Sequence, residues 1–151
     1  MYLKDIHIQQ IEELIKYEHD YLVQESKKEG FNFLIKLKSE YKNKTNTFNK
    51  TGECLYGLFQ GEKLIGIGGL NEDPYSENNK IGRLRRFYIA KDYRRIGLGN
   101  LLLKQLLSHA EKYFKVVVLH TDTKQGDAFY IANGFVKGEL FKGSSHYKVL
   151  Y

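Results

Sequence analysis

The stretch IGRLRRFYIAKDYRRIGLGNLLLKQLLSHAEKYF, residues 81–114, decides the fold of this chain. Its first part, 81–89, alternates in polarity and is rich in aromatic and β-branched residues, which predicts a strand. Its last part, 97–114, repeats leucines at spacings of three and four, which is typical of an amphipathic helix. The apolar run that follows predicts a second strand at 116–120, covered on both faces. Strand, crossover helix and strand form a βαβ unit, which we expect to be parallel and right-handed.

The predicted strand at 81–89 carries arginines among its apolar positions. Strict alternation assigns its side chains to two faces, the first with Leu84, Arg86 and Tyr88 and the second with Arg85, Phe87 and Ile89. The alternation is imperfect, so we expect a β-bulge within this strand.

The rest of the chain is predicted to complete one mixed sheet around this unit. Asp5 is expected to cap a first helix, whose apolar side carries Ile8, Ile11, Ile15 and Leu22. The other predicted elements are a helix at 31–41, a hairpin of 53–60 with 63–70, a short helix at 125–133 ended by Gly134, and a hairpin of 135–141 with 145–151. This order predicts a single domain over 1–151, with a mixed α/β fold, a mostly antiparallel central sheet and helices packed on it.

Length and composition exclude several classes of protein. The chain has 151 residues, a formal net charge of +6 and one cysteine, Cys54. A lone cysteine excludes an internal disulfide and cysteine-rich metal sites. No apolar run approaches the roughly 18 to 20 residues of a membrane span, and the N-terminus lacks the pattern of a signal peptide. We therefore expect a cytoplasmic protein with no metal site and no membrane partner.

Positive charge gathers around the turn between the first strand and the helix. The residues concerned are Lys80, Arg83, Arg85, Arg86, Lys91, Arg94, Arg95 and Lys104. The first N–H groups of a helix have no intrahelical partner and, with the helix dipole, attract anions by about 0.3 to 1 kcal/mol each. Gly97 and Gly99 have no Cβ to keep a phosphate from these amides, while Arg94 and Arg95 add donors. The turn therefore predicts a phosphate site, the alternatives being a solvated basic face or a tight turn without a ligand.

Two nucleotide-binding motifs are excluded at named positions. A P-loop requires Lys followed by Ser or Thr where this chain has Asn100 and Leu101. A dinucleotide fingerprint requires a third glycine where Leu102 stands, and a repeated βαβ series that is absent here.

The stretch RLRRFYIAKDYRRIGLGNLLLKQLL, 83–107, resembles the signature of the GNAT superfamily of acyl-CoA-dependent N-acetyltransferases. The signature is Arg/Gln-x-x-Gly-x-Gly/Ala after a strand that ends in an apolar-aromatic triplet. Arg94, Gly97 and Gly99 occupy its three defining places. The resemblance covers residues 50 to 150 and implies the GNAT fold, with the central sheet splayed at the cofactor site and helices on both faces.

A second motif supports the resemblance. DAFYIANGF, 127–135, is similar to the family pattern Ala-x-x-x-Tyr-x-x-x-Gly-Phe, with the alanine one or two places nearer than usual. Tyr130, Gly134 and Phe135 match it. The family's first strand would be very short or missing here, because it is expected before Asp5.

The resemblance implies acetyl-CoA as cosubstrate. Its diphosphate would lie on the amides of residues 95–100, and its pantetheine arm would run along 87–89 like an added strand, where this strand splays from 116–120. The residues expected at the cofactor are Phe87, Tyr88, Ile89, Arg94, Arg95, Ile96, Gly97, Leu98, Gly99 and Asn100.

The implied reaction is acetyl transfer to a primary amine by direct attack in a ternary complex. The Ile89 N–H is expected to stabilise the oxyanion, and the resemblance makes Tyr130 the acid for the departing thiolate. Glu72 is taken as the general base, with Asp73 and Asp122 as equal alternatives, or a chain of waters in place of a single base. His120 lies at a strand end next to the active centre and is expected to be a bystander. His146 is expected to be structural.

The sequence also allows other functions. A CoA-binding module without turnover would have the same fold and the same phosphate-binding turn at residues 94–100, which we call the cradle. Nucleic-acid binding is disfavoured because the arginines cluster at the cradle rather than along an extended face. The acceptor is expected to depend on the N-terminal helices and on loops 71–79 and 142–145, and its identity is open. Dimers are common in the superfamily, so a homodimer is an expectation of the resemblance.

Overall fold

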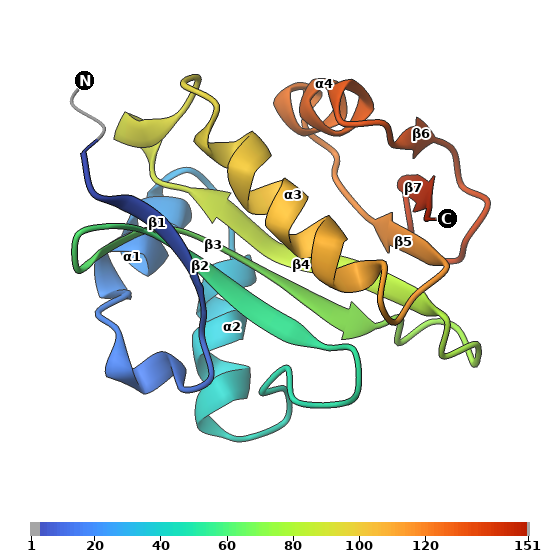
Figure 1. The fold of residues 1–151 in the computed structure, drawn as a ribbon, viewed down its shortest axis with the longest axis horizontal. Coiled ribbons are helices and arrows are strands. Elements are labelled where there is room, and N and C mark those ends of the chain that lie inside the picture. Colours follow the sequence, from blue (N-terminus) through green and yellow to red (C-terminus); the bar gives the residue numbers. More distant parts are fainter. Residues whose placement is uncertain (1–3, 151) are drawn as a thin grey trace.

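A computed structural model describes residues 4–150, and these form one seven-stranded sheet in the order β1-β2-β3-β4-β5-β7-β6. The strands are β1 Ile6–Gln10, β2 Cys54–Gln60, β3 Lys63–Glu72, β4 Ile81–Ile89, β5 Val116–Leu119, β6 Val136–Lys137 and β7 His146–Val149. Only β4 and β5 pair in parallel, and every other pair is antiparallel. The mixed, mostly antiparallel sheet predicted from the sequence is confirmed (Figure 1).

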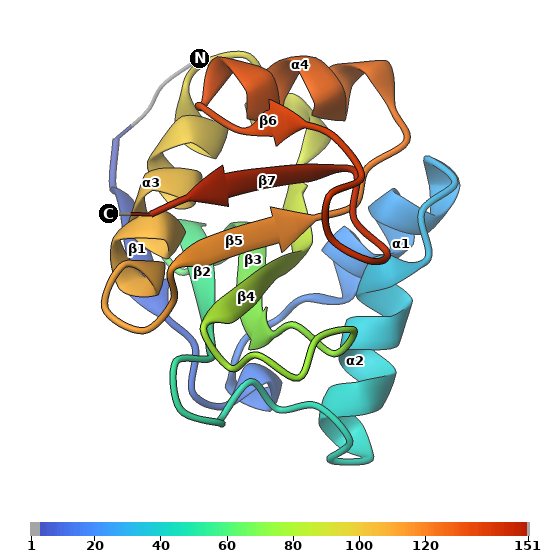
Figure 2. The ribbon, with the colours of Figure 1, turned by 90° about the vertical axis from the view of Figure 1, so that its right-hand side faces the viewer.

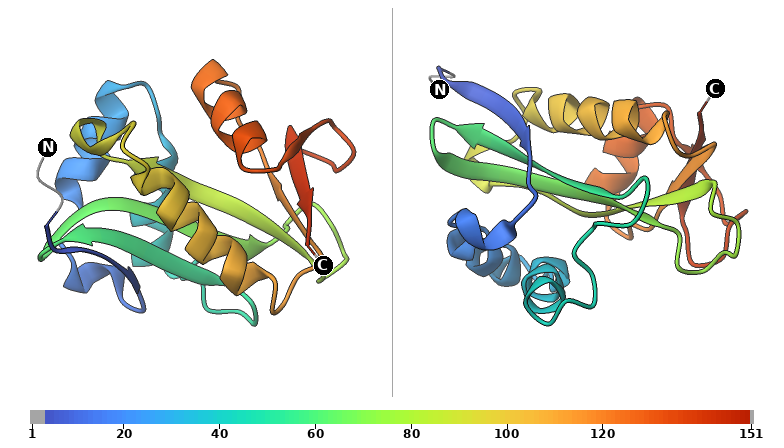
Figure 3. Two further views of the ribbon diagram at one scale, coloured as in Figure 1. Left: turned by 45° about the horizontal axis from the view of Figure 1, so that its top comes forward. Right: turned by 60° about the horizontal axis from the view of Figure 1, so that its bottom comes forward.

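Helices cover both faces of this sheet, as expected. They are α1 Asp20–Lys28, α2 Phe33–Lys42, α3 Leu98–Ala110 and α4 Lys124–Ala132, with 3₁₀ turns at Leu14–Lys16 and Lys91–Tyr93. In Figure 3, α1 and α2 lie on one face, and α3 and α4 lie on the other. Leu102, Leu103 and Leu106 are fully buried between α3 and the sheet, which confirms the leucine stripe. No helix within residues 4–150 is long and apolar enough to cross a bilayer.

The helix predicted to start at Asp5 is wrong. Asp5 has a left-handed backbone with φ +64, and β1 begins directly after it and pairs antiparallel with β2. The sequence IHIQQ in β1 alternates apolar and polar side chains, which suits an edge strand with one buried face. Ile15, assigned to the apolar side of that helix, is 87% exposed. The first strand therefore exists, but it follows Asp5 instead of preceding it.

The predicted bulge in β4 is confirmed, and it changes which side chains share a face. Arg86 has φ +59, and the register between β3 and β4 shifts between Ile67 and Gly69. Arg86 then contacts Glu40 of α2, and Arg85 contacts Asn71 on the same face of the sheet. The strict alternation predicted for this strand is therefore wrong at Arg85. Arg85 and Arg86 are adjacent in sequence but lie on the same face, because the extra residue of a β-bulge interrupts the alternation of side chains.

Strands β4 and β5 are paired only at their starts. The parallel register runs from Ile81 opposite Val116 to Arg83 opposite Val118 and then stops. Beyond it β4 continues to Ile89 while the chain leaves β5 toward α4, so the sheet opens between the two strands (Figure 2). This opening fixes the place of the site.

Candidate active site

A cavity of about 830 Å³ occupies the opening between β4 and β5. Its walls come from four segments: the end of β4, the turn that starts α3, the loop from β5 into α4, and the connection between α1 and α2. The first three lie along the α3 and α4 side, whereas Glu29, Phe31 and Phe33 come from the opposite face of the sheet. The cavity is therefore lined from both faces of the sheet, and its volume suits a substrate-sized ligand.

The turn before α3 presents a row of free backbone donors. Within residues 4–150, no acceptor is hydrogen-bonded to the N–H of any residue from 95 to 100. Gly97 has φ +88, and a Cβ placed there would meet nothing within 4 Å, because the space belongs to the cavity. Arg95 also has a left-handed backbone, with φ +65. Left-handed residues in such a turn form a concave backbone on which successive amides can converge, and this type of geometry binds phosphate groups.

Most of the residues predicted at the cofactor line this cavity. Phe87, Tyr88, Ile89, Arg94, Arg95, Gly97, Gly99 and Asn100 all do so. Leu98 is instead buried in the core, and the Ile96 side chain is 39% exposed and outside the cavity lining. Only the backbone of these two residues belongs to the turn.

The guanidinium of Arg94 is already hydrogen-bonded to other groups of the protein. Its Nε donates to the Ile89 carbonyl at 2.8 Å, and its two terminal nitrogens donate to the Glu29 carboxylate at 2.9 and 2.6 Å. The guanidinium also lies over the Tyr88 ring, 5.1 Å from the ring centroid. Arg94 therefore joins the end of α1 to the end of β4. The side chain of Arg95 is exposed and forms no hydrogen bond or ion pair within the described residues, so Arg95 is the arginine free to meet a phosphate.

Glu29 stays ionised in this cluster. The fork of hydrogen bonds from Arg94 lowers the pKa of Glu29 from its ordinary value near 4.5 to about 2, and the Tyr88 hydroxyl assists as a further donor. A carboxylate with so low a pKa is a poor base at neutral pH. Glu29 therefore serves to hold Arg94 in place.

The Glu29–Arg94 pair predicts a specific acid dependence of stability. A pKa lowered by folding stabilises the protein above the ordinary value, and this stabilisation is lost as pH falls from about 4.5 to about 2. We expect Glu29→Gln to melt at a lower temperature than the wild type at pH 6, and the difference to vanish near pH 2. Melting curves followed by circular dichroism across this range provide the measurement.

Glu111→Gln is the matched control, because Glu111 is exposed and forms no ion pair within residues 4–150. It should leave the melting temperature unchanged at every pH. A Glu29→Gln deficit that is constant from pH 6 to pH 2 would contradict the ion-pair explanation.

The end of β4 offers one unused backbone donor to the cavity. Ala90 N–H donates to the Ile65 carbonyl of β3, so the N–H and C=O of Ile89 face the opposite side of the strand, toward the opening. Arg94 occupies the Ile89 carbonyl. The Ile89 N–H has no partner within the part of the chain that the structure describes, as required of a donor to an oxyanion.

Tyr130 lies at the end of the cavity nearest α4. Its ring packs against Phe87, Phe129 and Phe135, with centroids 6.3, 5.1 and 5.5 Å away. Burial raises the pKa of Tyr130, so the phenol is protonated at neutral pH. Its hydroxyl makes no hydrogen bond within the described residues, although the side chain lines the cavity. The aromatic ring is held in place while the hydroxyl is free to donate to a ligand.

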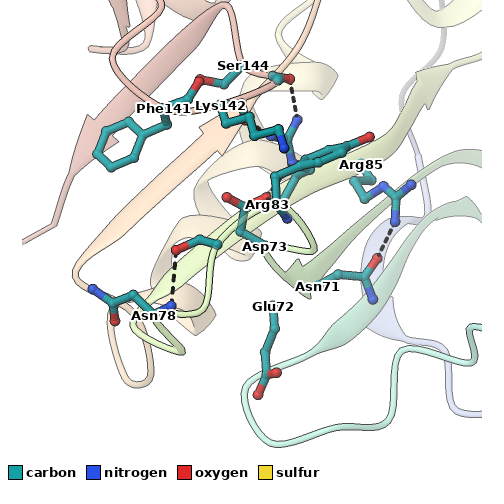
Figure 4. A network of polar contacts seen from close by, with 12 residues as sticks. Asn71, Glu72, Asp73, Asn78, Arg83, Arg85, Phe141, Lys142 and Ser144 are labelled. Atoms are coloured by element: carbon teal, nitrogen blue, oxygen red, sulfur yellow. Dashed lines mark hydrogen bonds and ion pairs between the residues drawn. The ribbon is translucent and has the colours of Figure 1, made fainter.

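The candidate bases separate into two groups. His120 and Asp122 line the cavity and are exposed. Glu72 is opposite Gly82 in the β3–β4 register, at the far end of β4 from Ile89, and Figure 4 shows its side chain pointing away from Arg83. The structure does not bring Glu72 together with the other predicted site residues.

Asp73 and His146 also lie outside the cavity lining. Asp73 is buried in an ion pair with Arg83 at 2.9 Å. His146 is 1% exposed and is held between the Asp127 carboxylate and the Ser145 hydroxyl, at 2.7 Å from each. These contacts fix α4 and β7, so they agree with the structural role expected for His146.

Sequence reasoning missed the wall contributed by the α1–α2 connection. Glu29, Phe31 and Phe33 line the cavity, although their spacing matches no motif. It also missed Thr123, whose hydroxyl accepts from Gly126 N–H at 2.9 Å and caps α4 beneath the cavity. The N-cap could have been found, because Thr followed by a helix pattern is a start signal.

A family model described as the acetyltransferase (GNAT) family matches residues 12–135. This chain belongs to the GNAT acetyltransferase family. The match includes the cradle at 94–100, the end of β4 and Tyr130, so it covers the cavity described above. The family predicted from the two sequence motifs is confirmed.

Solved structures share the fold of this GNAT protein. A protein from Exiguobacterium sp. 255-15 has a TM-score of 0.84 at 23% identity, covering 96% of this chain and 93% of that chain. A GNAT family acetyltransferase from Elizabethkingia anophelis with acetyl-CoA bound has a TM-score of 0.66 at 16% identity, covering 97% and 99%. PaiA N-acetyltransferase from Thermoplasma acidophilum in complex with coenzyme A has a TM-score of 0.60 at 21% identity, covering 95% and 98%.

One curated relative is similar over part of the GNAT protein. "Probable spermine N(1)-acetyltransferase" of Bacillus subtilis subsp. natto (strain BEST195) is 40% identical over 70 residues, which is 42% of this chain and 46% of that relative. The matched region is thus less than half the length of the relative.

Proposed function

We propose that this GNAT protein transfers an acetyl group from acetyl-CoA to a primary amine by direct attack in a ternary complex. The observation that carries the proposal is the cavity between β4 and β5, which joins the free amides of residues 95–100 to the Tyr130 hydroxyl. The same cavity has a separate wall from α1 and α2, where a second substrate can enter from the other face.

The residues of the cavity fit the parts of acetyl-CoA. The amides of 95–100 and the free guanidinium of Arg95 suit a diphosphate, and the missing Cβ of Gly97 leaves room for it. The edge of β4 at Phe87 and Ile89 faces the opening and suits the amides of an extended pantetheine arm. When bound, acetyl-CoA supplies an activated thioester for transfer.

Two groups of this chain then have defined tasks at the reacting atoms. The Ile89 N–H donates to the oxygen that gains charge as the amine attacks. Tyr130 donates a hydrogen bond to the sulfur as it becomes a thiolate. Because a thiol has an ordinary pKa near 8.5 and burial raises the pKa of Tyr130 above 10, complete proton transfer is uphill and the hydrogen bond is the contribution.

An alkylamine has an ordinary pKa near 10.4 and must lose a proton before it attacks. His120 and Asp122 are the ionisable side chains in the cavity lining that can accept a proton and have no ion-pair partner within residues 4–150. We assign deprotonation to one of these two, directly or through water.

Release of free thiol from acetyl-CoA tests the proposed function. We expect thiol release only when an acceptor amine is added, from a panel of ω-amino acids, amino acids, polyamines, aminoglycosides and peptides. Mass spectrometry should find one added acetyl group on the accepted amine. Binding of acetyl-CoA without turnover of any amine would indicate a CoA-binding module and contradict the proposal.

A further inference from the structure

Three arginines of β4 lie on the face of the sheet that carries α2, and two of them are neutralised. Arg83 forms a buried ion pair with Asp73 at 2.9 Å and donates to the carbonyls of Gly143 and Lys142 at 3.0 and 3.2 Å. Arg86 forms an ion pair with Glu40 of α2 at 2.8 Å. These two cations each have a carboxylate of their own.

Arg85 lies between them and forms no ion pair with a carboxylate within residues 4–150. Its single hydrogen bond within the described residues is a long contact of 3.5 Å to the Asn71 side-chain oxygen, visible in Figure 4. Asn71 is a neutral amide and is already paired with the Asn46 side chain at 3.0 Å in both directions. The side chain of Arg85 is half-buried.

A half-buried cation in this position has lost part of its hydration without gaining an ion-pair partner within residues 4–150. Burial lowers the pKa of Arg85, and the neighbouring charges of Arg86 and Arg83 also lower it, against a smaller opposing effect of the Glu40 carboxylate that is paired with Arg86. Removing part of the hydration of a charge costs free energy unless an opposite charge or good hydrogen bonds replace it. Most of the donors of the Arg85 guanidinium have no acceptor within residues 4–150, so an anion bound here would supply what the protein lacks.

Arg85 lies on the α2 face of the sheet, which is the face from which the acceptor is proposed to enter the cavity. Arg83 is opposite Val118 where the β4–β5 pairing ends, so Arg85 stands two residues further along β4, at the start of the opening and just outside the cavity lining. His120 lines the cavity. Ile89 and Arg85 are opposite Gly66 and Gly69 of β3. At about 3.3 Å per residue of β3, Arg85 is therefore roughly 10 Å along the sheet from Ile89, a span that a long arginine side chain and a short substrate can bridge together.

We propose, on the basis of the proposed function, that Arg85 binds an anionic group, a carboxylate or a phosphate, at the end of the acceptor remote from its amine. The acceptor is then an amino acid, an ω-amino acid or an aminoalkyl phosphate. A polycation such as spermine meets a positive charge at this position and is a poor acceptor.

Four amines test this assignment: 6-aminohexanoate, its neutral amide 6-aminohexanamide, 6-aminohexyl phosphate and spermine. Affinities are measured by calorimetry on the protein saturated with coenzyme A, and turnover is measured separately with acetyl-CoA. We expect the wild type to bind at least one of the two anionic amines at least about 10-fold more tightly than the neutral amide, and the stronger of the two identifies the anion. We expect Arg85→Gln to abolish this preference while the affinity for the neutral amide changes less than about twofold.

The matched control is Lys104→Gln, which removes one positive charge from the exposed side of α3 and should preserve the preference. Arg85→Lys keeps the charge but loses the fork, and should retain part of the preference. Equal binding of anionic and neutral amines by the wild type, or equal weakening of all amines by Arg85→Gln with an unchanged melting temperature, would overturn the assignment. An anionic preference without turnover would instead uphold Arg85 and reject the proposed transferase activity.

Discussion

Gly97→Glu is expected to weaken acetyl-CoA binding at least about 100-fold while the protein remains folded. Gly97 has φ +88, where a residue with a Cβ is strained by about 1 to 2 kcal/mol. Its Cα faces open space in the cavity, so the new carboxylate would enter the place proposed for the diphosphate. Lost charge-assisted hydrogen bonds to the amides of 95–100, at about 1.5 to 3 kcal/mol each, make the effect large. Isothermal calorimetry with acetyl-CoA measures it.

Gly61→Glu separates backbone strain from the loss of the site. Gly61 lies in the turn between β2 and β3 with φ +59, also has open space at its Cβ position, and is outside the cavity lining. Both variants should lose similar stability in thermal melts, but only Gly97→Glu should lose acetyl-CoA. Wild-type affinity in the Gly97 variant would remove the basis for placing the diphosphate at this turn.

Tyr130→Phe is expected to lower kcat about 100-fold and to change KM for acetyl-CoA by less than about threefold. The variant loses only the hydroxyl, whose proposed donation to the thiolate matters as charge develops on sulfur. The ring contacts with Phe87, Phe129 and Phe135 are retained. Because the hydroxyl has no hydrogen-bond partner within the described residues, the melting temperature should be unchanged. Steady-state kinetics with a saturating amine provide the measurement.

Tyr113→Phe is the control for this substitution, because Tyr113 is 40% exposed and outside the cavity lining. It should keep wild-type kinetics. If Tyr130→Phe raised KM alone, the hydroxyl would contribute to binding of the ground state and the assignment to the thiolate would be wrong.

The sequence determined the parts of this protein that depend on near neighbours. The strand, the glycine turn and the helix of 81–114 were predictable because polarity repeats and missing Cβ atoms act within a few residues. Gly134 was predictable as a helix end for the same reason, and it has φ +89 after α4. The first strand was mispredicted because IHIQQ is too short to distinguish a period of two from a helix pattern, and its pairing with β2 is decided by a segment far along the chain.

Only the tertiary structure decided how distant residues meet at the site. Arg94 and Glu29 are 65 positions apart, so no spacing could show that one arginine of the cradle is bound to α1 while Arg95 remains free. The β4 bulge at Arg86 placed Arg85 on the α2 face, and the β3–β4 register put Glu72 at the far end of the sheet from the cavity. Such contacts depend on packing and strand register, which side-chain periodicity alone does not specify.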